Sequence, residues 1–373
     1  MINHQPIEKI QQKAKTNGNQ TNKLERINNQ PGDEMLLERP QNQIQEEEFL
    51  IRPTEMSDLE KAVELFNVCS LHMIGKKEAS LTDVRSEWLL PEFDLETATR
   101  IVLIPEGKVV GYIEVWDIDR TPVRVWVWGR VHPDYEGRGI GTNLMKWAEE
   151  RARQAIDKVP ADLQVTMQSG SFSTYEAAHE LFRDRGMKTI RHFYTMATEL
   201  DSLPEKPQWP DGLHVRNIRG EAEIRDVIWV IRDAFKDHWG YVEQPFKEEY
   251  QRWLHFIRHD DKYDPSLWFL ALDGDEIAGI SLCEEKSSED PNMGWVNVLG
   301  VRRPWRKRGL GLALLQHSFR EFYSRGKHRA GLGVDASSLT GATRLYEKAG
   351  MKPIRQFTVS QKVLRPGLDI ATR

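Results

Sequence analysis

The apolar and polar positions of the chain follow one pattern twice. Within residues 49–200, short apolar runs alternate with segments in which apolar residues recur every three or four positions. Strands have the first pattern, and amphipathic helices have the second. The same order of elements returns within residues 213–373. We therefore expect two α/β domains built on one plan, an N-terminal half and a C-terminal half.

Two polar segments flank or divide these halves. Residues 1–48 are rich in Gln, Asn, Lys and Glu and poor in large apolar side chains. A segment of this composition buries too little surface to offset its chain entropy, so a disordered polar tail is predicted. Residues 201–212 contain Pro204, Pro207 and Pro210, which is the composition of a linker.

A glycine loop occurs once in each half, between a predicted strand and a predicted helix. The two loops are Glu136-Gly137-Arg138-Gly139-Ile140-Gly141 and Arg306-Lys307-Arg308-Gly309-Leu310-Gly311. The backbone N–H groups of such a loop and the dipole of the helix that follows attract a phosphate group. Glycine allows the tight backbone conformation that the turn needs. Each half is therefore predicted to present a phosphate-binding loop.

The overall composition narrows the class of protein. The net charge is −5, and the two cysteines, Cys69 and Cys283, lie in different halves. No apolar run is long enough to span a bilayer, the N-terminus lacks the apolar core of a signal peptide, and neither cysteine has metal-ligand neighbours at a useful spacing. We expect a cytoplasmic protein without a disulfide, a metal site or a membrane segment. The basic cluster around Trp305 is short and lies in an acidic chain, so no nucleic-acid partner is expected.

Two motifs in the C-terminal half resemble those of the GNAT superfamily, the acyl-CoA N-acyltransferases. Arg306 to Gly311 matches the family's Arg/Gln-x-x-Gly-x-Gly/Ala motif for acetyl-CoA, and Gly341 to Met351 resembles a second family motif. The resemblance covers residues 49–365, and the doublet arrangement is similar to that of mycothiol synthases. It implies an α/β (α+β) fold of two tandem GNAT-like domains. Each would have a mixed, mostly antiparallel central sheet that is splayed at the acyl-CoA site and flanked by helices.

The resemblance also implies the partners and the residues that bind them. Acetyl-CoA would be the acyl-donor substrate, and a primary amine of a small molecule or peptide would be the acceptor. The residues expected to bind acetyl-CoA are Leu299, Gly300, Val301, Arg306, Lys307, Arg308, Gly309, Leu310, Gly311 and Ser338, with Val131, Gly137, Arg138, Gly139 and Gly141 in the N-terminal half. Gly300 suggests a bulge that separates its strand from the neighbouring one. A backbone N–H of Leu299 or Gly300 would polarise the thioester carbonyl.

Direct acetyl transfer needs a neutral amine, a polarised carbonyl and a proton for the departing thiolate. Tyr346 stands where the family places the thiolate-protonating acid, although a helix-face aromatic residue can also simply pack on a sheet. The base stays open. Asn297, on the strand before the loop, can hold a water but accepts no proton, and Glu284 or Glu285 at the end of the preceding strand can act through water. His238 is a further candidate.

The acceptor pocket is less clearly marked than the phosphate loop. The segment from Trp229 to Phe256 is rich in aromatic residues, which line a pocket or belong to the core. Asp237 and Glu243, within the same segment, would suit a cationic amine.

The N-terminal half departs from the family pattern at two positions. Glu136 replaces the Arg or Gln that opens the loop, and Phe182, which cannot donate a proton, stands at the place of Tyr346. We therefore predict N-acetyltransferase chemistry in the C-terminal half and a non-catalytic N-terminal half, in a monomer or homodimer. The alternative is a non-enzymatic acyl-CoA-binding or sensing protein in which both GNAT domains are degenerate.

Overall fold

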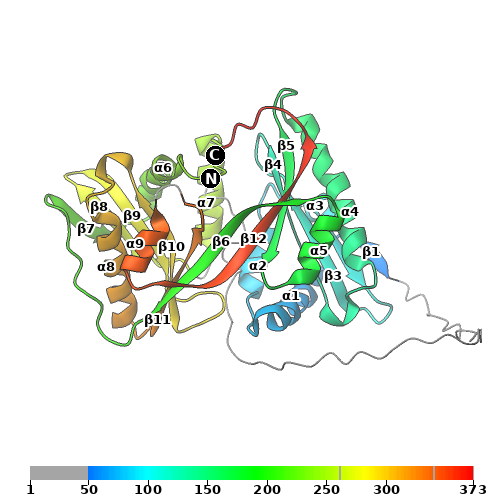
Figure 1. The fold of residues 1–373 in the computed structure, drawn as a ribbon, viewed down its shortest axis with the longest axis horizontal. Coiled ribbons are helices and arrows are strands. Elements are labelled where there is room, and N and C mark those ends of the chain that lie inside the picture. Colours follow the sequence, from blue (N-terminus) through cyan, green and yellow to red (C-terminus); the bar gives the residue numbers. More distant parts are fainter. Residues whose placement is uncertain (1–48, 260–261, 339–340, 373) are drawn as a thin grey trace, which may run out of the picture.

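The computed structural model describes residues 49–259, 262–338 and 341–372. Its strands form one 12-stranded sheet in the order β1-β2-β3-β4-β5-β12-β6-β11-β10-β9-β8-β7 (Figure 1). Two neighbouring pairs, β4 with β5 and β10 with β11, are parallel, and the other pairs are antiparallel. The predicted fold of two tandem, mostly antiparallel α/β domains is confirmed. The predicted polar tail lies outside the described residues.

The N-terminal half packs helices on both faces of its part of the sheet. Its elements are β1 (Leu50–Arg52), α1 (Leu59–Ile74), α2 (Leu81–Trp88), α3 (Leu95–Ala98), β2 (Thr99–Leu103), β3 (Val109–Trp116), β4 (Arg124–Val131), α4 (Ile140–Arg153), β5 (Val165–Phe172), α5 (Glu176–Asp184) and β6 (Lys188–Glu199). Helices α1 and α2 pack around Tyr112 and Trp128, whereas α4 packs around Ile113 and Val127. The faces alternate in this way because successive residues of a strand point to opposite sides of the sheet.

The C-terminal half repeats this layered arrangement. Its elements are β7 (Leu213–Asn217), α6 (Ile224–Phe235), α7 (Phe246–His259), β8 (Trp268–Asp273), β9 (Glu276–Glu284), β10 (Met293–Val301), α8 (Leu310–Ser324), β11 (Arg329–Asp335), α9 (Ala342–Lys348) and β12 (Lys352–Arg365). Helices α6 and α7 pack around Ile280 and Leu282, and α8 and α9 pack on the other face around Cys283 and Leu332.

The last strand of each half lies among the strands of the other half. β12 pairs with β5 and with β6, and β6 pairs in turn with β11 of the C-terminal half. Figure 1 shows β6 and β12 side by side in the middle of the molecule, extending between the two halves. Each half alone would lack the strand that lies next to its β5 or its β11. The boundaries 49–200 and 213–373 stay a prediction, and strand pairing crosses them.

Polar contacts between helices join the halves beside this exchanged pair of strands. His255 on α7 makes a hydrogen bond of 2.8 Å from its Nε2 to the carbonyl oxygen of Ser86 on α2. Lys262 Nζ donates to Asp83 Oδ2 at 3.0 Å. These contacts hold α2 of the N-terminal half against α7 and the segment that follows it.

Candidate active site

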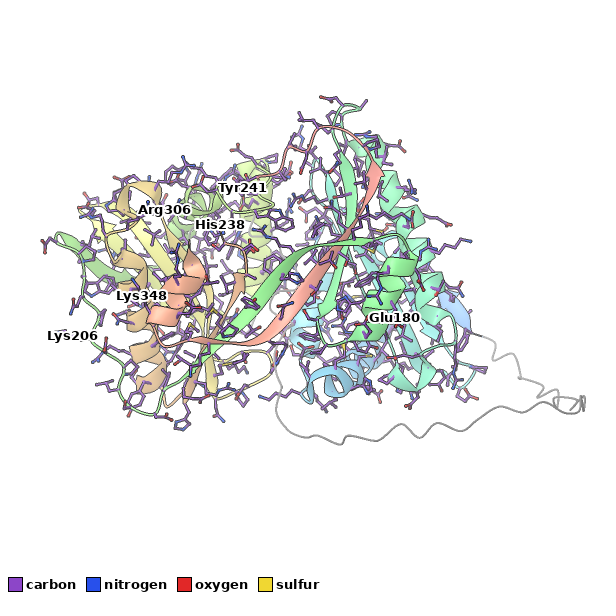
Figure 2. The ribbon with its side chains drawn as sticks, in the orientation of Figure 1. Glu180, Lys206, His238, Tyr241, Arg306 and Lys348 are labelled. Atoms are coloured by element: carbon purple, nitrogen blue, oxygen red, sulfur yellow. The ribbon has the colours of Figure 1, made fainter. Side chains whose placement is uncertain are left out.

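A cavity of about 960 Å³ is lined by residues of both halves. The C-terminal half contributes the ends of β10 and β11, the glycine loop, α9 and the segment after α6, and the N-terminal half contributes parts of α2, β3 and β4. His238, Tyr241 and Arg306 all line this cavity, and Figure 2 shows them in the same part of the C-terminal half. The cavity is thus where the glycine loop and the segment after α6 meet.

Strands β10 and β11 separate at the cavity. Their parallel ladder ends at the pair Val296 and Leu332. At the same point β10 is bulged, since its register against β9 shifts between Val296 and Val298. Val296 packs in the cluster on the α8 side and Val298 in the cluster on the α6 side, although residues two apart on a regular strand share a face. The remainder of β10, residues 299–301, borders the cavity along an edge that β11 does not cover.

The bulge lies at Asn297 and not at Gly300, which corrects the expectation from the sequence. As the extra residue, exposed Asn297 allows both Val296 and Val298 to stay buried. Glycine is needed at position 300 for a different reason, because a Cβ at Gly300 would lie 3.1 Å from Phe235 Cε2. It is the close approach of α6 to the β10 backbone that requires a small residue there.

The glycine loop ends in the first turn of α8. Gly309 is the N-cap residue and has a φ of +89°. A Cβ at Gly309 would meet no atom within 4 Å, so the backbone conformation alone requires glycine. Gly311 differs, because a Cβ there would lie 3.3 Å from Leu345 Cδ1, and glycine allows α8 to pack against α9. The first N–H groups of α8 have no partner within the helix, which is the geometry that binds an anion.

Arg306 holds this loop against α6. Its Nε donates to Val301 O at 3.0 Å and its Nη2 donates to Ala234 O at 2.8 Å. Its Nη1 donates to Asp237 Oδ2 at 2.8 Å, and Arg303 pairs with the same carboxylate. Hydrogen bonds from Arg303 and Arg306 lower the pKa of Asp237 to about 2. Arg306 therefore positions the loop, and the carboxylate of Asp237 is paired with both arginines.

Tyr346 reaches the cavity from α9. Its side chain is 8% exposed and packs in the same cluster as the apolar face of α8. Burial raises the pKa of Tyr346 to about 12, so the phenol is neutral at physiological pH. No hydrogen bond to its hydroxyl group is found within the part of the chain that the structure describes. The residue both packs against the sheet and presents a proton donor to the cavity.

Glu284 and Asn297 are brought together across β9 and β10. Asn297 Nδ2 donates to Glu284 Oε1 at 3.1 Å, and both residues line the cavity. The bulge exposes Asn297 on this side. Glu285 is exposed, and Lys327 Nζ lies 2.9 Å from its carboxylate. Of the two carboxylates considered as a base, Glu284 is the one beside the bulge.

His238 lines the same cavity from the turn after α6. Its ring lies over Phe235, with the ring centroids 4.4 Å apart. Burial, with a smaller contribution from the charge of Arg306, lowers the pKa of His238. A neutral imidazole can accept a proton, so His238 keeps the chemical competence of a base.

The corresponding region of the N-terminal half has no bulge and carries side-chain contacts that the C-terminal half lacks. β4 pairs with β3 without a shift in register, so this half has no bulge beside its loop. Tyr175 donates a hydrogen bond to Glu136, the residue at the place of Arg306. Cys69 Sγ donates to Val131 O at 3.1 Å. β4 also leaves β5 after the pair Trp126 and Gln168, so the two halves differ here in the bulge and in these side-chain contacts, and not in the parting of the strands.

The expected binding residues separate into two groups. Those lining the cavity are Leu299, Gly300, Val301, Arg306, Lys307, Gly309, Leu310, Gly311 and Ser338, together with the expected catalytic residues Tyr346, Asn297 and Glu284. Those that do not line it are Arg308 and, in the N-terminal half, Val131, Gly137, Arg138, Gly139 and Gly141.

Sequence reasoning did not find the part of the cavity that the N-terminal half supplies. Glu114, Trp116 and Trp126 line the cavity from β3 and β4. Their alternating positions in the sequence are those of any half-buried strand. Only the docking of the two halves gives these residues a place in the site.

The splayed strands, the loop at a helix N-terminus and the buried phenol together define an α/β acyltransferase. The chain belongs to the acetyltransferase (GNAT) family, whose sequence profile matches residues 62–187 and 228–351. No helix among the described residues has the length and apolar composition to cross a bilayer.

Two curated relatives that match more than half of the chain are named for the same activity. Mycothiol acetyltransferase of Streptomyces scabiei is 30% identical over 257 residues, covering 67% of this chain and 76% of that enzyme. Mycothiol acetyltransferase of Nocardia farcinica is 29% identical over 231 residues, covering 60% of this chain and 69% of that enzyme.

Solved structures share the two-domain fold. A GCN5-related N-acetyltransferase from Sphaerobacter thermophilus matches with a TM-score of 0.70 and 33% identity, covering 87% of this chain and 98% of that chain. A tandem GNAT protein from the clavulanic acid biosynthesis pathway matches with a TM-score of 0.63 and covers 86% of this chain and all of that one. At 17% identity the second match shows the fold alone.

Proposed function

We propose that this protein transfers an acetyl group from acetyl-CoA to a primary amine of a small molecule or peptide, and that the C-terminal half carries out the chemistry. The observation that supports this assignment most strongly is the bulge at Asn297, which lies where β10 and β11 part. The N-terminal half has no equivalent bulge, and Tyr175 and Glu136 join across its loop. Strands part beside the glycine loop in both halves, but the bulge at that point is a property of the C-terminal half.

The donor would lie along the open edge of β10. Its diphosphate would accept hydrogen bonds from the N–H groups of residues 308–311, with the helix dipole of α8 adding to the attraction. Lys307, which lines the cavity, supplies a positive charge beside the loop. Successive N–H groups of a strand point to opposite edges, so one of Leu299 and Gly300 points its N–H toward the open edge. That N–H would polarise the thioester carbonyl.

The acetyl transfer then follows as direct attack. Glu284, held by Asn297, accepts a proton from the ammonium form of the acceptor, directly or through a water. The neutral amine attacks the carbonyl carbon, forming the C–N bond, and the C–S bond breaks as the tetrahedral intermediate collapses. The hydroxyl group of Tyr346 gives its proton to the departing sulfur, and the second amine proton passes to the resulting tyrosinate. Glu284 releases the first proton to solvent, which restores both groups. Tyr346 suits this role because its high pKa keeps it protonated.

Two mycothiol acetyltransferases match 60% and 67% of this chain, and their name gives acetyl transfer as their activity. We extend that activity to this protein without extending their substrate. We also propose that it acts in the cytoplasm as a monomer or homodimer.

The test uses the intact chain, because each half lacks an exchanged strand when isolated. Calorimetric titration with acetyl-CoA should give saturable binding, and mass spectrometry of a primary-amine panel should find a mass increase of one acetyl group on at least one amine. Absence of binding heat with acetyl-CoA and with longer acyl-CoA homologues would overturn the proposal.

A further inference from the structure

The N-terminal half builds one side of the cavity with side chains suited to a polar cation. Five residues form this surface, which we call the interface wall: Ser86, Glu87, Glu114, Trp116 and Trp126. They come from α2, β3 and β4, and they face the cavity that also contains Glu284 and Tyr346 of the C-terminal half. The charged members of the interface wall are both carboxylates.

Glu114 is held in place by a chain of buried hydrogen bonds. Trp88 Nε1 donates to the hydroxyl oxygen of Tyr112 at 3.1 Å, and this hydroxyl donates to Glu114 Oε2 at 2.8 Å. Tyr112 is fully buried and Glu114 is 5% exposed. Because the Glu114 carboxylate is already fixed, a cation that binds to it pays less for the loss of side-chain entropy than it would at a mobile carboxylate. Trp116 is also fixed, since it stacks on Phe93 with ring centroids 4.2 Å apart.

Two polar atoms of the interface wall have no hydrogen-bond partner in the described structure. They are Trp126 Nε1 and Ser86 Oγ, and both residues are more than nine-tenths buried. A buried donor or acceptor left without a partner costs about 1 to 3 kcal/mol. Ligands that bring hydrogen-bonding groups to this surface remove that cost, and apolar ligands of the same size do not.

The carboxylates expected from the sequence to suit a cation are used elsewhere. Asp237 pairs with Arg303 and Arg306, and Glu243 accepts from Arg232 Nη2 at 3.0 Å. Glu87 and Glu114, by contrast, line the cavity from α2 and β3 of the N-terminal half.

We propose that the acceptor is a polar amine with a second cationic nitrogen, and that the interface wall binds this second cation while Glu284 faces the amine to be acetylated. This inference rests on the proposed acetyl transfer. Glu114 and Glu87 supply the opposite charge, and the faces of Trp116 and Trp126 add a cation–π attraction. Trp126 Nε1 can donate a hydrogen bond, and Ser86 Oγ can donate or accept one, to polar groups of the ligand or to water bound with it. The N-terminal half thus selects the acceptor for chemistry performed in the C-terminal half.

A matched series of acceptors tests the proposal. The four probes are butane-1,4-diamine, 4-aminobutan-1-ol, butan-1-amine and 4-aminobutanoate, which keep the reacting amine and change only the far end, and longer diamines extend the series. Wild-type kcat/KM should be at least about tenfold higher for the best diamine than for the equal-length monoamine. The amino alcohol should lie between them, and the anionic probe should be the poorest.

Three variants test whether residues of the interface wall cause the preference for the diamine and the amino alcohol. Glu114→Gln and Glu87→Gln should each reduce the diamine-to-monoamine ratio several-fold, and Ser86→Ala should reduce the advantage of the amino alcohol over the monoamine. Glu176→Gln is the control, since Glu176 is an exposed N-terminal-half carboxylate paired with Arg183 and absent from the cavity lining. It should leave every ratio unchanged. Since Glu87 is only half buried, its variant should fold even if the Glu114 variant does not.

Calorimetric binding of the same four probes to the CoA-loaded protein separates the two proposals. Diamine binding that weakens in Glu87→Gln supports cation binding by the interface wall. If no amine is acetylated in that case, the proposed acetyl transfer fails, and only the binding of the cation by the wall is supported. Equal turnover of diamine and monoamine, or a ratio unaltered by both glutamate variants, overturns the inference while leaving acetyl transfer intact.

Discussion

Phe182 and Tyr346 occupy the same place in the two halves. The carbonyl oxygen of each accepts a hydrogen bond from the N–H of a methionine five positions later, Met187 at 2.9 Å and Met351 at 3.0 Å. Both rings are buried, at 6% and 8% exposure. At this place the two halves therefore differ by a single hydroxyl group.

The hydroxyl group of Tyr346 is expected to matter for turnover and little for folding. Tyr346→Phe should lower kcat by about 100- to 1,000-fold, the usual contribution of a positioned proton donor, with a nearly unchanged Kd for acetyl-CoA. Steady-state kinetics and calorimetry measure the two quantities. Phe182→Tyr, in the half without the chemistry, should leave kcat unchanged. A kcat within twofold of wild type in Tyr346→Phe across the pH range would remove Tyr346 as the acid.

Gly309 and Gly139 offer a matched pair for the phosphate-binding loop. Both have positive φ, +89° and +80°, and a Cβ at either would meet no atom within 4 Å. Gly309→Glu and Gly139→Glu should therefore lose similar stability, about 1 to 2 kcal/mol, from backbone strain alone. Only Gly309→Glu places a carboxylate at the proposed diphosphate site, so its affinity for acetyl-CoA should fall more than about 100-fold. Equal affinities in the two variants would contradict the assignment of the donor to the C-terminal loop.

The base can be identified by comparing two variants. Glu284→Gln should lower kcat/KM by about 100-fold and flatten the rising limb of the pH profile, because the carboxylate that accepts the proton is gone. Burial lowers the pKa of His238, so His238 is already neutral where the acceptor begins to lose its proton. His238→Gln should change kcat/KM less than tenfold and keep the shape of the profile. If His238→Gln reduced kcat/KM more than Glu284→Gln did, the base would be His238.

Glu149 links the exchanged strand to the N-terminal half. It accepts from Lys362 Nζ on β12 at 2.7 Å, from Arg153 at 2.8 Å and from Arg185 at 3.0 Å. Burial by itself would raise the pKa of Glu149, but the hydrogen bonds from Lys362 and the arginines lower it to about 2. Glu149→Gln should lower the free energy of unfolding by about 2 to 4 kcal/mol at pH 7.

The effect of Glu149 should depend on pH with a definite sign. A carboxyl group whose pKa is lower in the folded state contributes its full stabilisation of the fold above its unfolded-state pKa, about 4.3. This stabilisation is lost as the pH falls through the folded-state pKa, about 2. The difference between wild type and Glu149→Gln in urea unfolding should therefore shrink from pH 5 to pH 2. A constant difference over that range would mean that the carboxylate charge is not what stabilises β12.

Because the two halves exchange strands, they should stay associated after the linker between them is cleaved. A protease site placed within residues 201–212 should be cleavable, yet the two fragments should co-elute in native buffer, because β6 and β12 each pair with strands of the other half. Mixing with urea and removing it should restore the complex only when both fragments are present. Fragments that separate in native buffer after cleavage would contradict the exchange.

The order of helices and strands and the family of the chain could be predicted because their signals are local. The glycine loop from Arg306 to Gly311 has a pattern that follows from the backbone conformation of one turn, whatever surrounds it. The same holds for the difference between Phe182 and Tyr346, which a comparison of the two repeats reveals. Gly300 shows the limit, since its glycine signals the approach of α6 and not the bulge.

Several features depend on contacts between residues far apart in the chain. Asp237, which by its position in the sequence would suit a cationic acceptor, pairs with Arg303 and Arg306 in the folded protein. The position of the bulge depends on which neighbours bury Val296 and Val298 on opposite faces. No periodicity within β10 carries that information.

The sequence by itself determined the repeated α/β plan, the loop at the start of α8 and the chemical difference between the halves, because each arises from residues within a few positions of one another. Only the tertiary structure decided that β6 and β12 each pair with a strand of the other half, and that Glu114 lines the same cavity as Glu284. Strand partners and cavity walls are selected by the burial of surfaces from distant segments, and the free energy of that burial exists only once both surfaces have met.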